Sequence, residues 1–477
     1  MPSSTLVWLR HGLRLRDHPA FVDAAEHGAV VPLFVWAPEE EGDWPPGDAA
    51  QWWLHHALRD LGERLRERGS RLILRTGPTS DALRAAAAEA GADRVVWNRR
   101  YEPHLARRDA NVREALEEDG IETQVFESQI LHDPEGVETT SGGPYHVFTP
   151  FWKKVRKENL LRTGTPLDVP DLPAPPTWPS SEPLDALGLA TGVGDGARGI
   201  HEAWTPTVGG AHDRLDYTLE HVVADYDAAR DRPDQDGTAR LSPFLHHGHL
   251  SPRQVWHRVG TWADETGRHD DARPLLRQVV FREFAYHWLH HYPDTPTKTY
   301  RDKFRDFPWR DDADALARWK QGQTGYPIVD AGMRQLAETG WMHNRVRMIV
   351  ASFLTKDLMI HWRHGARWFW DRLVDADLAS NTFNWQWTAG CGADAQPFFR
   401  VFNPVSQSER HDPDGDYIRR YVPELADLPD DALHTPWEES DARLEAFGVT
   451  LGETYPRPMV DHSEAREDAL AAYETVK

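Results

Sequence analysis

The first 130 residues alternate between short apolar runs and amphipathic stretches, and this alternation limits the fold more than any other feature. The amphipathic stretches, such as 51–68 and 79–90, carry apolar residues at helical spacing. Strands that alternate with helices form a parallel sheet, because parallel strands need a crossover connection. The sequence therefore predicts an α/β domain at 1–131, a parallel sheet with flanking helices, whose strands lie at 5–9, 30–36, 71–75 and 94–97.

Helical periodicity is lost after this domain. Residues 163 to 200 are rich in Pro, Gly and Asp and include the string PLDVPDLPAPPTWPSSEP. Such composition is typical of a segment that crosses the surface without packing as an element. We therefore expect an inter-domain linker at 132–210.

From about residue 212 the chain shows long helical patterns without strand alternation. Within 341–360 an apolar stripe predicts a long amphipathic helix. We therefore predict a second, mainly α-helical domain at 211–477. The stripe consists of Val346, Ile349, Val350, Phe353 and Leu354.

Cys391 is the only cysteine of the chain. An intramolecular disulfide, a multi-cysteine zinc site and an iron–sulfur cluster held by this chain are therefore excluded. No metal site is predicted, and redox chemistry would need an organic cofactor. No G-x-G-x-x-G follows a predicted strand, so the first domain is not expected to hold a Rossmann-type nucleotide site.

The formal net charge is -22, and only eight of the 54 basic residues are Lys. Binding of nucleic acid needs Lys or Arg that face the phosphates, so the total charge argues against it. Total charge is not local charge, however, and a basic patch can lie within an acidic surface. General solubility and an acidic surface with a local DNA-binding patch both stay open at this point.

The sequence contains no uncharged apolar run of about 18 residues, the length that a membrane helix needs. The first residues, MPSS, lead into a strand-like run and not into a basic, apolar signal peptide. We therefore expect a cytoplasmic protein of the bacterial type, without a membrane segment.

Tryptophan is abundant, with 21 residues in the chain and thirteen of them at or after Trp204. A single Trp usually fills a core or anchors a surface. Four of them, however, lie in segments that also hold polar residues at repeated spacings: Trp309, Trp362, Trp385 and Trp387.

The segment GWMHNRVRM at 340–348 places three unlike side chains on one helical face. Asn344, Arg347 and Met348 are spaced i, i+3 and i+4. An amide, a guanidinium and a thioether on one face suit a planar heteroaromatic ligand better than a packed core. The segment is therefore a candidate ligand site.

The segment LVDADLASNTFNWQW at 373–387 places Asp375, Asp377 and Asn381 close together. Nearby carboxylates repel one another unless a cation neutralises them, so Arg347 is a natural partner of Asp375. The alternative is an ordinary cap, in which either aspartate caps a helix that begins near Leu378.

These segments belong to a longer series of motifs that resembles the flavin domain of DNA photolyases and cryptochromes. The similarity runs from VWLRHGLRLRDHPA at 7–20 to about residue 460, and the chain looks most like a class I cyclobutane pyrimidine dimer photolyase. Its specific strings are TGYPIVDAGMRQL (324–336), GWMHNRVRM, DADLASN (375–381), NWQW (384–387), RVFNP (400–404) and YIRRYVPEL (417–425).

The resemblance implies a photolyase antenna-type first domain and a bent FAD in the helical domain, with Asn381 facing the flavin N5. It also implies an electron relay from the flavin to the surface through Trp385, Trp362 and Trp309. By motif position the FAD would be held by Tyr226, Thr238, Ala239, Arg240, Leu241, Ser242, Arg282, Asn344, Arg347, Asp375, Asp377 and Asn381.

The implied substrate is ultraviolet-damaged DNA, bound by a monomer without an obligate protein partner. A damaged base pair flipped out of the duplex would enter a pocket next to the flavin. By motif position the substrate contacts are Arg230, Gln278, Phe281, Asn344, Met348, Trp387, Arg400 and Gln407.

The lesion is predicted from positions at which related families differ. Cyclobutane-dimer enzymes often carry Glu and Trp where this chain has Gln278 and Phe281, which weakens the assignment. The (6-4) photolyases usually carry His at the positions of Asn344 and Met348, and without it that reaction loses its proton donor. Light-driven cyclobutane-dimer repair is therefore predicted first, with blue-light signalling of the cryptochrome type and (6-4) repair as alternatives.

A second, light-harvesting chromophore is compatible with the first domain. Folate-binding members usually carry Asn-Glu just after the Tyr-Glu of NRRYEP, whereas His104 and Leu105 follow Pro103 here. The identity of an antenna is therefore left open.

A further hypothesis is a nucleotide-binding protein without photochemistry. This hypothesis would explain only the first domain.

Overall fold

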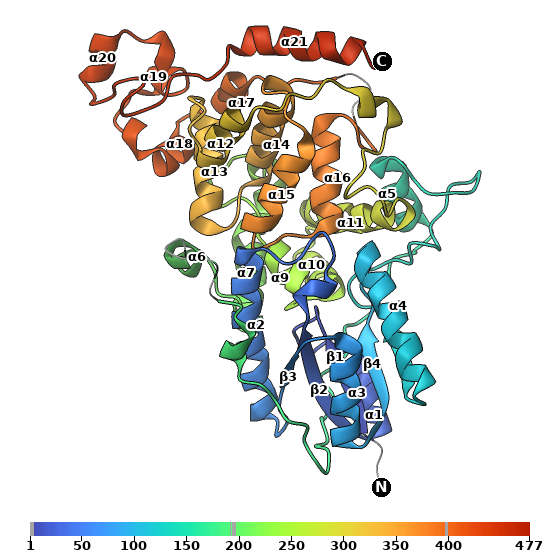
Figure 1. Ribbon diagram of the computed structural model, residues 1–477. Coiled ribbons are helices and arrows are strands. Elements are labelled where there is room, and N and C mark those ends of the chain that lie inside the picture. The colour runs from blue at the N-terminus through green and yellow to red at the C-terminus, as the bar shows by residue number, and fades with distance from the viewer. Residues whose placement is uncertain (1–3, 191, 193–196, 396–398) are drawn as a thin grey trace.

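The computed structural model describes residues 4–190, 192, 197–395 and 399–477. The N-terminal part of the chain forms an α/β part at the bottom of Figure 1, and the C-terminal part of the chain forms a helical part at the top. None of the helices within the described residues combines the length and the apolar character that crossing a bilayer requires.

A single five-stranded sheet forms the centre of the α/β part. All neighbouring strands are parallel, in the order β3-β2-β1-β4-β5. Four strands match the predicted ones, whereas β5 was not predicted, because ETQVF offers few apolar residues and forms a half-exposed edge strand. The strands are β1 Ser4–Leu9, β2 Ala29–Trp36, β3 Ile73–Thr76, β4 Ala92–Asn98 and β5 Glu122–Phe126.

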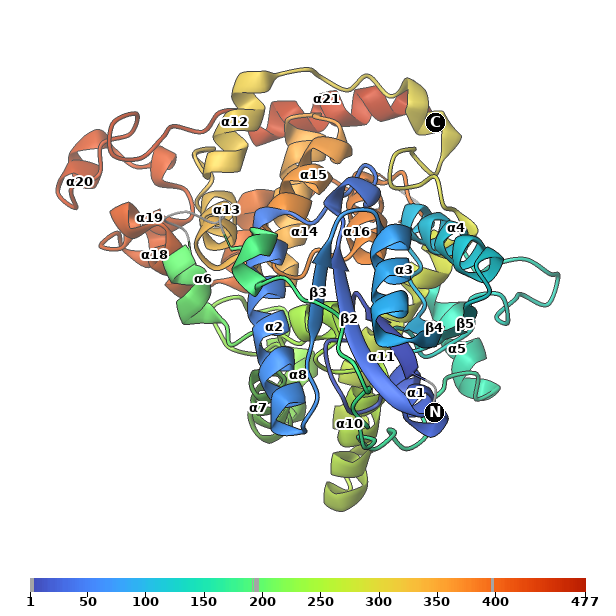
Figure 2. The same cartoon turned by 60° about the horizontal axis from the view of Figure 1, so that its bottom comes forward.

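Helices cover both faces of this sheet (Figure 2). α1 (Pro19–His27) and α2 (Asp48–Glu67) share one apolar core with one face, and α3 (Thr79–Ala90) and α4 (Pro103–Glu118) share another core with the opposite face. The helices predicted at 51–68 and 79–90 correspond to α2 and α3. A short 3-10 turn, η1, spans Pro38–Glu40.

The segment predicted as a linker contains a packed helix. α5 (Phe148–Lys157) buries Phe151 and Val155 completely and packs against α11 (His269–His291). Its sequence FTPFWKKVRK carries apolar residues on one helical face. The prediction of a linker at 132–210 did not include this helix. The same segment holds η2 (Leu184–Leu187) and α6 (Ala197–Ala203).

The remaining part is helical, as predicted, and its described residues form no strand beyond two isolated bridges. Besides α11, its elements are α7 Val208–Tyr217, η4 Thr218–Val222, η5 Val223–Asp225, α8 Tyr226–Ala229, α9 Ser242–His247, α10 Pro252–Thr266, η6 Asp302–Asp306, α12 Ala313–Gln321, α13 Pro327–Thr339, α14 Asn344–Ser352, η7 Phe353–Asp357, α15 Trp362–Arg372, α16 Leu378–Ala389, α17 Pro404–His411, α18 Asp416–Tyr421, η8 Pro423–Leu425, α19 Asp430–Leu433, η9 Pro436–Glu438, α20 Asp441–Glu445 and α21 His462–Glu474.

One continuous apolar core joins the two parts. Trp53 of α2 stacks on His247 of α9 with 5.5 Å between ring centroids, and packs edge-on against Phe244 and Trp204. The α/β part is thereby fixed to the helical part beside α9, which also contributes to the candidate site.

Candidate functional site

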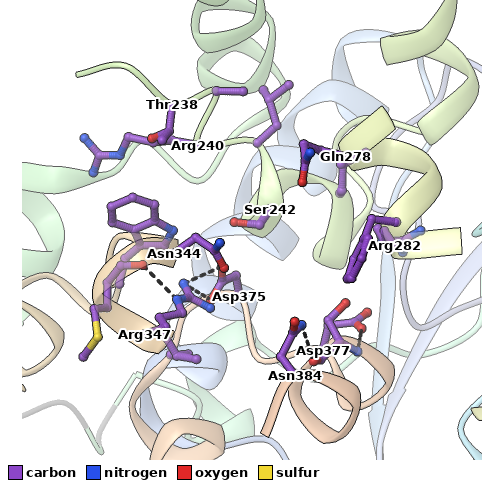
Figure 3. A pocket seen from close by; sticks show the side chains of 18 of the residues that line it. Thr238, Arg240, Ser242, Gln278, Arg282, Asn344, Arg347, Asp375, Asp377 and Asn384 are labelled. Atoms are coloured by element: carbon purple, nitrogen blue, oxygen red, sulfur yellow. Dashed lines mark hydrogen bonds and ion pairs between the residues drawn. The ribbon is translucent and has the colours of Figure 1, made fainter. Parts of the chain in front are cut away.

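A cavity of about 310 Å³ lies inside the helical part. Its walls come from residues before and within α9 and from α11, α14 and α16, segments that lie far apart in the sequence (Figure 3). All twelve residues predicted to hold the cofactor line this one cavity. The structure therefore brings the whole predicted set together.

Arg347 and Asp375 form the predicted pair across this cavity (Figure 3). Arg347 Nη2 donates to both carboxylate oxygens of Asp375, at 2.9 and 3.1 Å, and Nε donates to the Met342 carbonyl at 2.8 Å. On the same face of α14, the Asn344 amide nitrogen lies 3.9 Å from the Met348 sulfur. The predicted face of unlike side chains is confirmed.

Asp377 has two tasks in the structure. One carboxylate oxygen caps α16 by accepting from the Ser380 amide at 2.8 Å, so the capping alternative is confirmed for this residue. The other oxygen accepts from the Tyr286 hydroxyl and lies 3.8 Å from His246 Nδ1. Burial raises the pKa of Asp377, but His246, Arg282 and Tyr286 outweigh burial and hold this pKa well below its usual range.

Arg240 is a half-buried cation that forms no ion pair within the described part of the chain. Its backbone has a φ of 50°, and its guanidinium lies over the rings of Trp204 and Trp341, at 4.6 and 5.0 Å. Burial, together with the charge of Arg214, lowers its pKa, and its buried Nε has no hydrogen-bond partner. A half-buried guanidinium whose buried Nε is a free donor fits an anionic ligand group such as a pyrophosphate.

Asn381 lies one turn into α16, where its side chain lines the cavity. Its amide nitrogen donates to the Ala366 carbonyl at 3.0 Å, which fixes the orientation of the amide. The amide oxygen accepts no hydrogen bond from any residue that the structure describes. A fixed, uncharged acceptor is thereby presented to a ligand.

The predicted substrate residues divide into three groups. Arg230, Gln278, Phe281, Asn344 and Met348 line the same cavity as the cofactor residues. Trp387 and Arg400 instead line a small neighbouring cavity of about 20 Å³, which shares Thr388 with the large one. Gln407 lies buried on α17 and lines neither cavity.

The three predicted relay tryptophans differ in exposure. Trp385 lines the cavity, Trp362 is fully buried and Trp309 is partly exposed. Gly365 of α15 lies against Trp385 so closely that a Cβ there would overlap the indole ring. The His361 ring lies between the other two indoles, 5.5 Å from Trp362 and 5.0 Å from Trp309.

Comparison with known proteins places this geometry in a family. Residues 5–176 match the family described as DNA photolyase, and residues 275–475 match the FAD binding domain of DNA photolyase. A deoxyribodipyrimidine photo-lyase from Agrobacterium fabrum is 47% identical over 99% of this chain and 98% of the relative. The chain belongs to the DNA photolyase and cryptochrome family. The predicted cofactor, FAD, is confirmed by the match of its helical part.

Other relatives show the range of this family. Cryptochrome-2 of Arabidopsis thaliana is 37% identical over 98% of this chain and 78% of the relative. A solved class III photolyase from Agrobacterium tumefaciens, 46% identical, superposes with a TM-score of 0.95 over 100% of this chain and 98% of that one. The similarity to class I enzymes in particular stays a prediction.

A solved relative also bears on the antenna. An archaeal photolyase from Sulfolobus tokodaii, described with two FAD molecules, superposes with a TM-score of 0.83 at 29% identity, covering 99% of this chain and 100% of that one. A second chromophore is therefore known within the photolyase family.

Several cavity residues of this photolyase-family chain were not predicted. His246 lies four residues after Ser242 on α9, and its Nδ1 is buried without a hydrogen-bond partner in the described structure. Asn384 and Thr388 lie three and seven residues after Asn381 on α16. Extending the helical spacing from the predicted residues would have found all three.

Proposed function

We propose that this protein repairs cyclobutane pyrimidine dimers in ultraviolet-damaged DNA, using light and leaving no net redox change. The observation that carries the proposal is that one cavity is lined by the FAD residues and by five of the predicted substrate residues. A base pair flipped out of the duplex into this cavity would lie next to the cofactor. The curated photo-lyase relative, similar over nearly its whole length, supports the same activity.

Bound FAD would supply the light-excited electron donor. The chain would orient it, because Arg240 offers a free donor to its phosphates. Arg282 lies at the other side of the cavity (Figure 3). Burial lowers the pKa of Arg282, but Tyr286 and Asp377 raise it by more, so this pKa lies above its usual value. Asn381 would present its fixed amide to the flavin edge. These roles follow from the donors and acceptors that line the cavity.

The relay proposal rests on the different exposure of Trp385, Trp362 and Trp309. Indole rings at the cavity wall, in the core and near the surface would carry electrons inward to the cofactor. His361 would separate the last two rings as an uncharged spacer, because burial and the charge of Arg363 lower its pKa to about 4.

A basic groove beside the cavity supports DNA binding despite the acidic total charge. Arg230 and Gln278 line both the cavity and this open groove, which Arg156 and Arg277 also line. Neither Arg156 nor Arg277 forms an ion pair with a carboxylate among the residues that the structure describes; they lie over the rings of Trp152 and Phe148 instead. Asp227, Asp270 and Asp271 lie in the same groove.

Helix α5 lines this groove through Trp152 and Arg156, and it also carries three lysines, of which Lys154 is paired with Glu158 at 2.9 Å. Three of the eight lysines of the chain, Lys153, Lys154 and Lys157, lie in this one helix. Uneven placement of so few lysines favours a local phosphate-binding surface within an acidic protein.

Asn344 and Met348 favour the cyclobutane lesion over the (6-4) lesion, because neither side chain transfers protons as an imidazole does. Signalling of the cryptochrome type is the second candidate, supported by the 37% identity to a plant cryptochrome. Gln278 and Phe281, which stand where cyclobutane-dimer enzymes often carry Glu and Trp, both line the cavity. A substrate bound in the cavity would therefore meet both of these residues.

The test is a repair assay with the flavin-loaded protein. Duplexes that contain one cyclobutane thymine dimer or one (6-4) product are illuminated with blue light, with dark samples as controls. We expect restoration of the cyclobutane duplex only, and only in the light. Protein that binds this duplex but never repairs it would favour signalling, and repair of the (6-4) duplex alone would overturn the lesion assignment.

A further inference from the structure

Lys356 is a buried cation in η7 that neither the cofactor nor the substrate set uses. Its side chain is 3% exposed. Nζ donates to the carbonyl of Arg400 at 2.5 Å and lies 4.3 Å from the centre of the Phe399 ring. A lysine in the turn that follows α14 is thereby bound to a chain segment 44 residues away.

No carboxylate neutralises this ammonium within the described structure. The adjacent Asp357 is buried and bound to His462 of α21. A buried charge without a counter-ion costs stability, so its presence calls for a role that a Met or Leu could not fill.

Charged and titratable groups from every neighbouring element face Lys356. Asp357 lies on its own element, Cys391 and Arg400 come from the chain between α16 and α17, and Arg301 and Tyr473 line the same small cavity. Burial lowers the pKa of Lys356 to about 7; Cys391 and Asp357 oppose this, and Arg400 adds to it. Near neutral pH the ammonium is therefore close to losing its charge.

Two side chains on one face of this helical segment hold the chain around Arg400. Ser352, one turn before Lys356, accepts a hydrogen bond from the Phe402 amide at 3.2 Å. Lys356 holds the other end through the Arg400 carbonyl and the Phe399 ring.

Arg400 lies between these two attachments and is exposed. Its guanidinium lies 4.7 Å from the Phe402 ring and lines the small cavity together with Trp387. The direction of the guanidinium therefore depends on a backbone that Lys356 fixes.

We propose that Lys356 is a positioning residue for DNA binding, which holds the backbone of Arg400 so that the guanidinium meets DNA beside Trp387. The proposal rests on the proposed function, DNA repair, and on the prediction from motif position that Arg400 contacts the DNA. The ammonium touches no DNA itself, because it is buried. Its effect must therefore pass through Arg400.

The test measures binding of a labelled duplex with one cyclobutane dimer, in the dark, to flavin-loaded protein. Lys356→Met, Arg400→Ala and the double variant are compared with Lys320→Met. Lys320 is the matched control, because its ammonium also lies over a ring, that of Trp368 at 4.9 Å, outside the two cavities. Retained FAD shows that each variant has folded.

Lys356→Met and Arg400→Ala are each expected to weaken binding by about threefold or more. In the Arg400→Ala background, Lys356→Met is expected to change binding by less than about twofold, because the group through which it acts is gone. Lys320→Met is expected to bind as the unaltered protein does. Additive losses in the double variant would overturn the proposal.

A pH series adds a readout that a packing role would not move, and it needs no variant at Lys356. Binding by the unaltered protein is expected to weaken between pH 6 and pH 8, as Lys356 loses its charge. Arg400→Ala, at an exposed position, is expected to lack this component. A pH dependence of equal size in Arg400→Ala would contradict the proposal.

The outcomes separate this inference from the proposed function. Arg400→Ala with undiminished binding would remove both the DNA contact and the role of Lys356. A weakened Arg400→Ala beside an unaffected Lys356→Met would remove only the role of Lys356. Failure of the unaltered protein to repair the dimer in light would instead remove the proposed repair activity, whatever the binding results.

Discussion

Arg347 donates from a single guanidinium nitrogen to both carboxylate oxygens of Asp375, across 28 residues of sequence. The Asp375 side chain is only 3% exposed, and Arg347 is its ion-pair partner at 2.9 Å. Arg347→Met would leave a buried, unpaired carboxylate. We expect a loss of about 2–4 kcal/mol in the free energy of unfolding, and weaker retention of FAD, measured by urea unfolding and by flavin absorbance.

The matched control for this prediction is Arg345→Met on the same helix. Arg345 pairs with Asp231 at 2.5 Å, but Asp231 is 37% exposed and neither residue lines the cavity. An ion pair in contact with water contributes about 1 kcal/mol or less. Equal losses of FAD in the two variants would show that the Asp375 pair has no special relation to the cofactor.

Gly365 is a position at which a single added methyl group is expected to disturb the site. A Cβ at this residue would overlap the Trp385 indole, whereas a Cβ at Gly260 of α10 would meet open space. Gly365→Ala is expected to cost about 1–3 kcal/mol through overpacking. Gly260→Ala is expected to be neutral or stabilising by about 0.5–1 kcal/mol, because Ala favours a helix. Thermal unfolding compares them, and a stable Gly365→Ala protein would contradict the packing of Trp385 against α15.

Trp362 tests the relay. Trp362→Phe is expected to abolish most light-driven reduction of the bound flavin by an external reductant, because the middle indole is replaced by a ring that is much harder to oxidise. Repair by chemically reduced protein is expected to continue. Trp97→Phe removes another fully buried indole, from β4 of the α/β part, and is expected to leave photoreduction unchanged. Equal photoreduction in the two variants would contradict the proposed relay through Trp362.

Much of the fold follows from simple periodicity. Four strands were predicted because their apolar runs are buried, whereas β5 was missed because an edge strand needs few apolar residues. α5 was missed because Pro-rich sequence surrounds it. Local composition cannot show that a short amphipathic helix packs against an element such as α11, more than a hundred residues further along.

The site was predicted best where motifs are dense. The twelve cofactor positions meet in one cavity because motif order carries their spatial arrangement. His246 was missed although it lies one helical turn after the predicted Ser242, whereas His361 contributes its ring through tertiary contact and not through a recognisable spacing. Lys356 was read as part of a plain helix at 341–360. The structure instead ends α14 at Ser352 and continues as a π-helical turn, and the burial of Lys356 depends on a distant loop.

Lys356 also predicts a stability that depends on pH. Its pKa in the folded protein, about 7, lies below the ordinary value of 10.5, so the unfolded chain binds more protons between these two values. The cost of burying the ammonium is therefore fully present below about pH 7 and disappears as the pH rises toward 10.5.

Lys356→Met is expected to be more stable than the unaltered protein at pH 6, by roughly 2–4 kcal/mol, with an advantage that shrinks steadily toward pH 10. Urea unfolding across this range measures the difference, with Lys320→Met as the matched control. An advantage independent of pH would mean that the pKa of Lys356 is the same in the folded and the unfolded protein. A destabilised variant at pH 6 would mean that the bond to Arg400 and the contact with Phe399 outweigh the cost of burial.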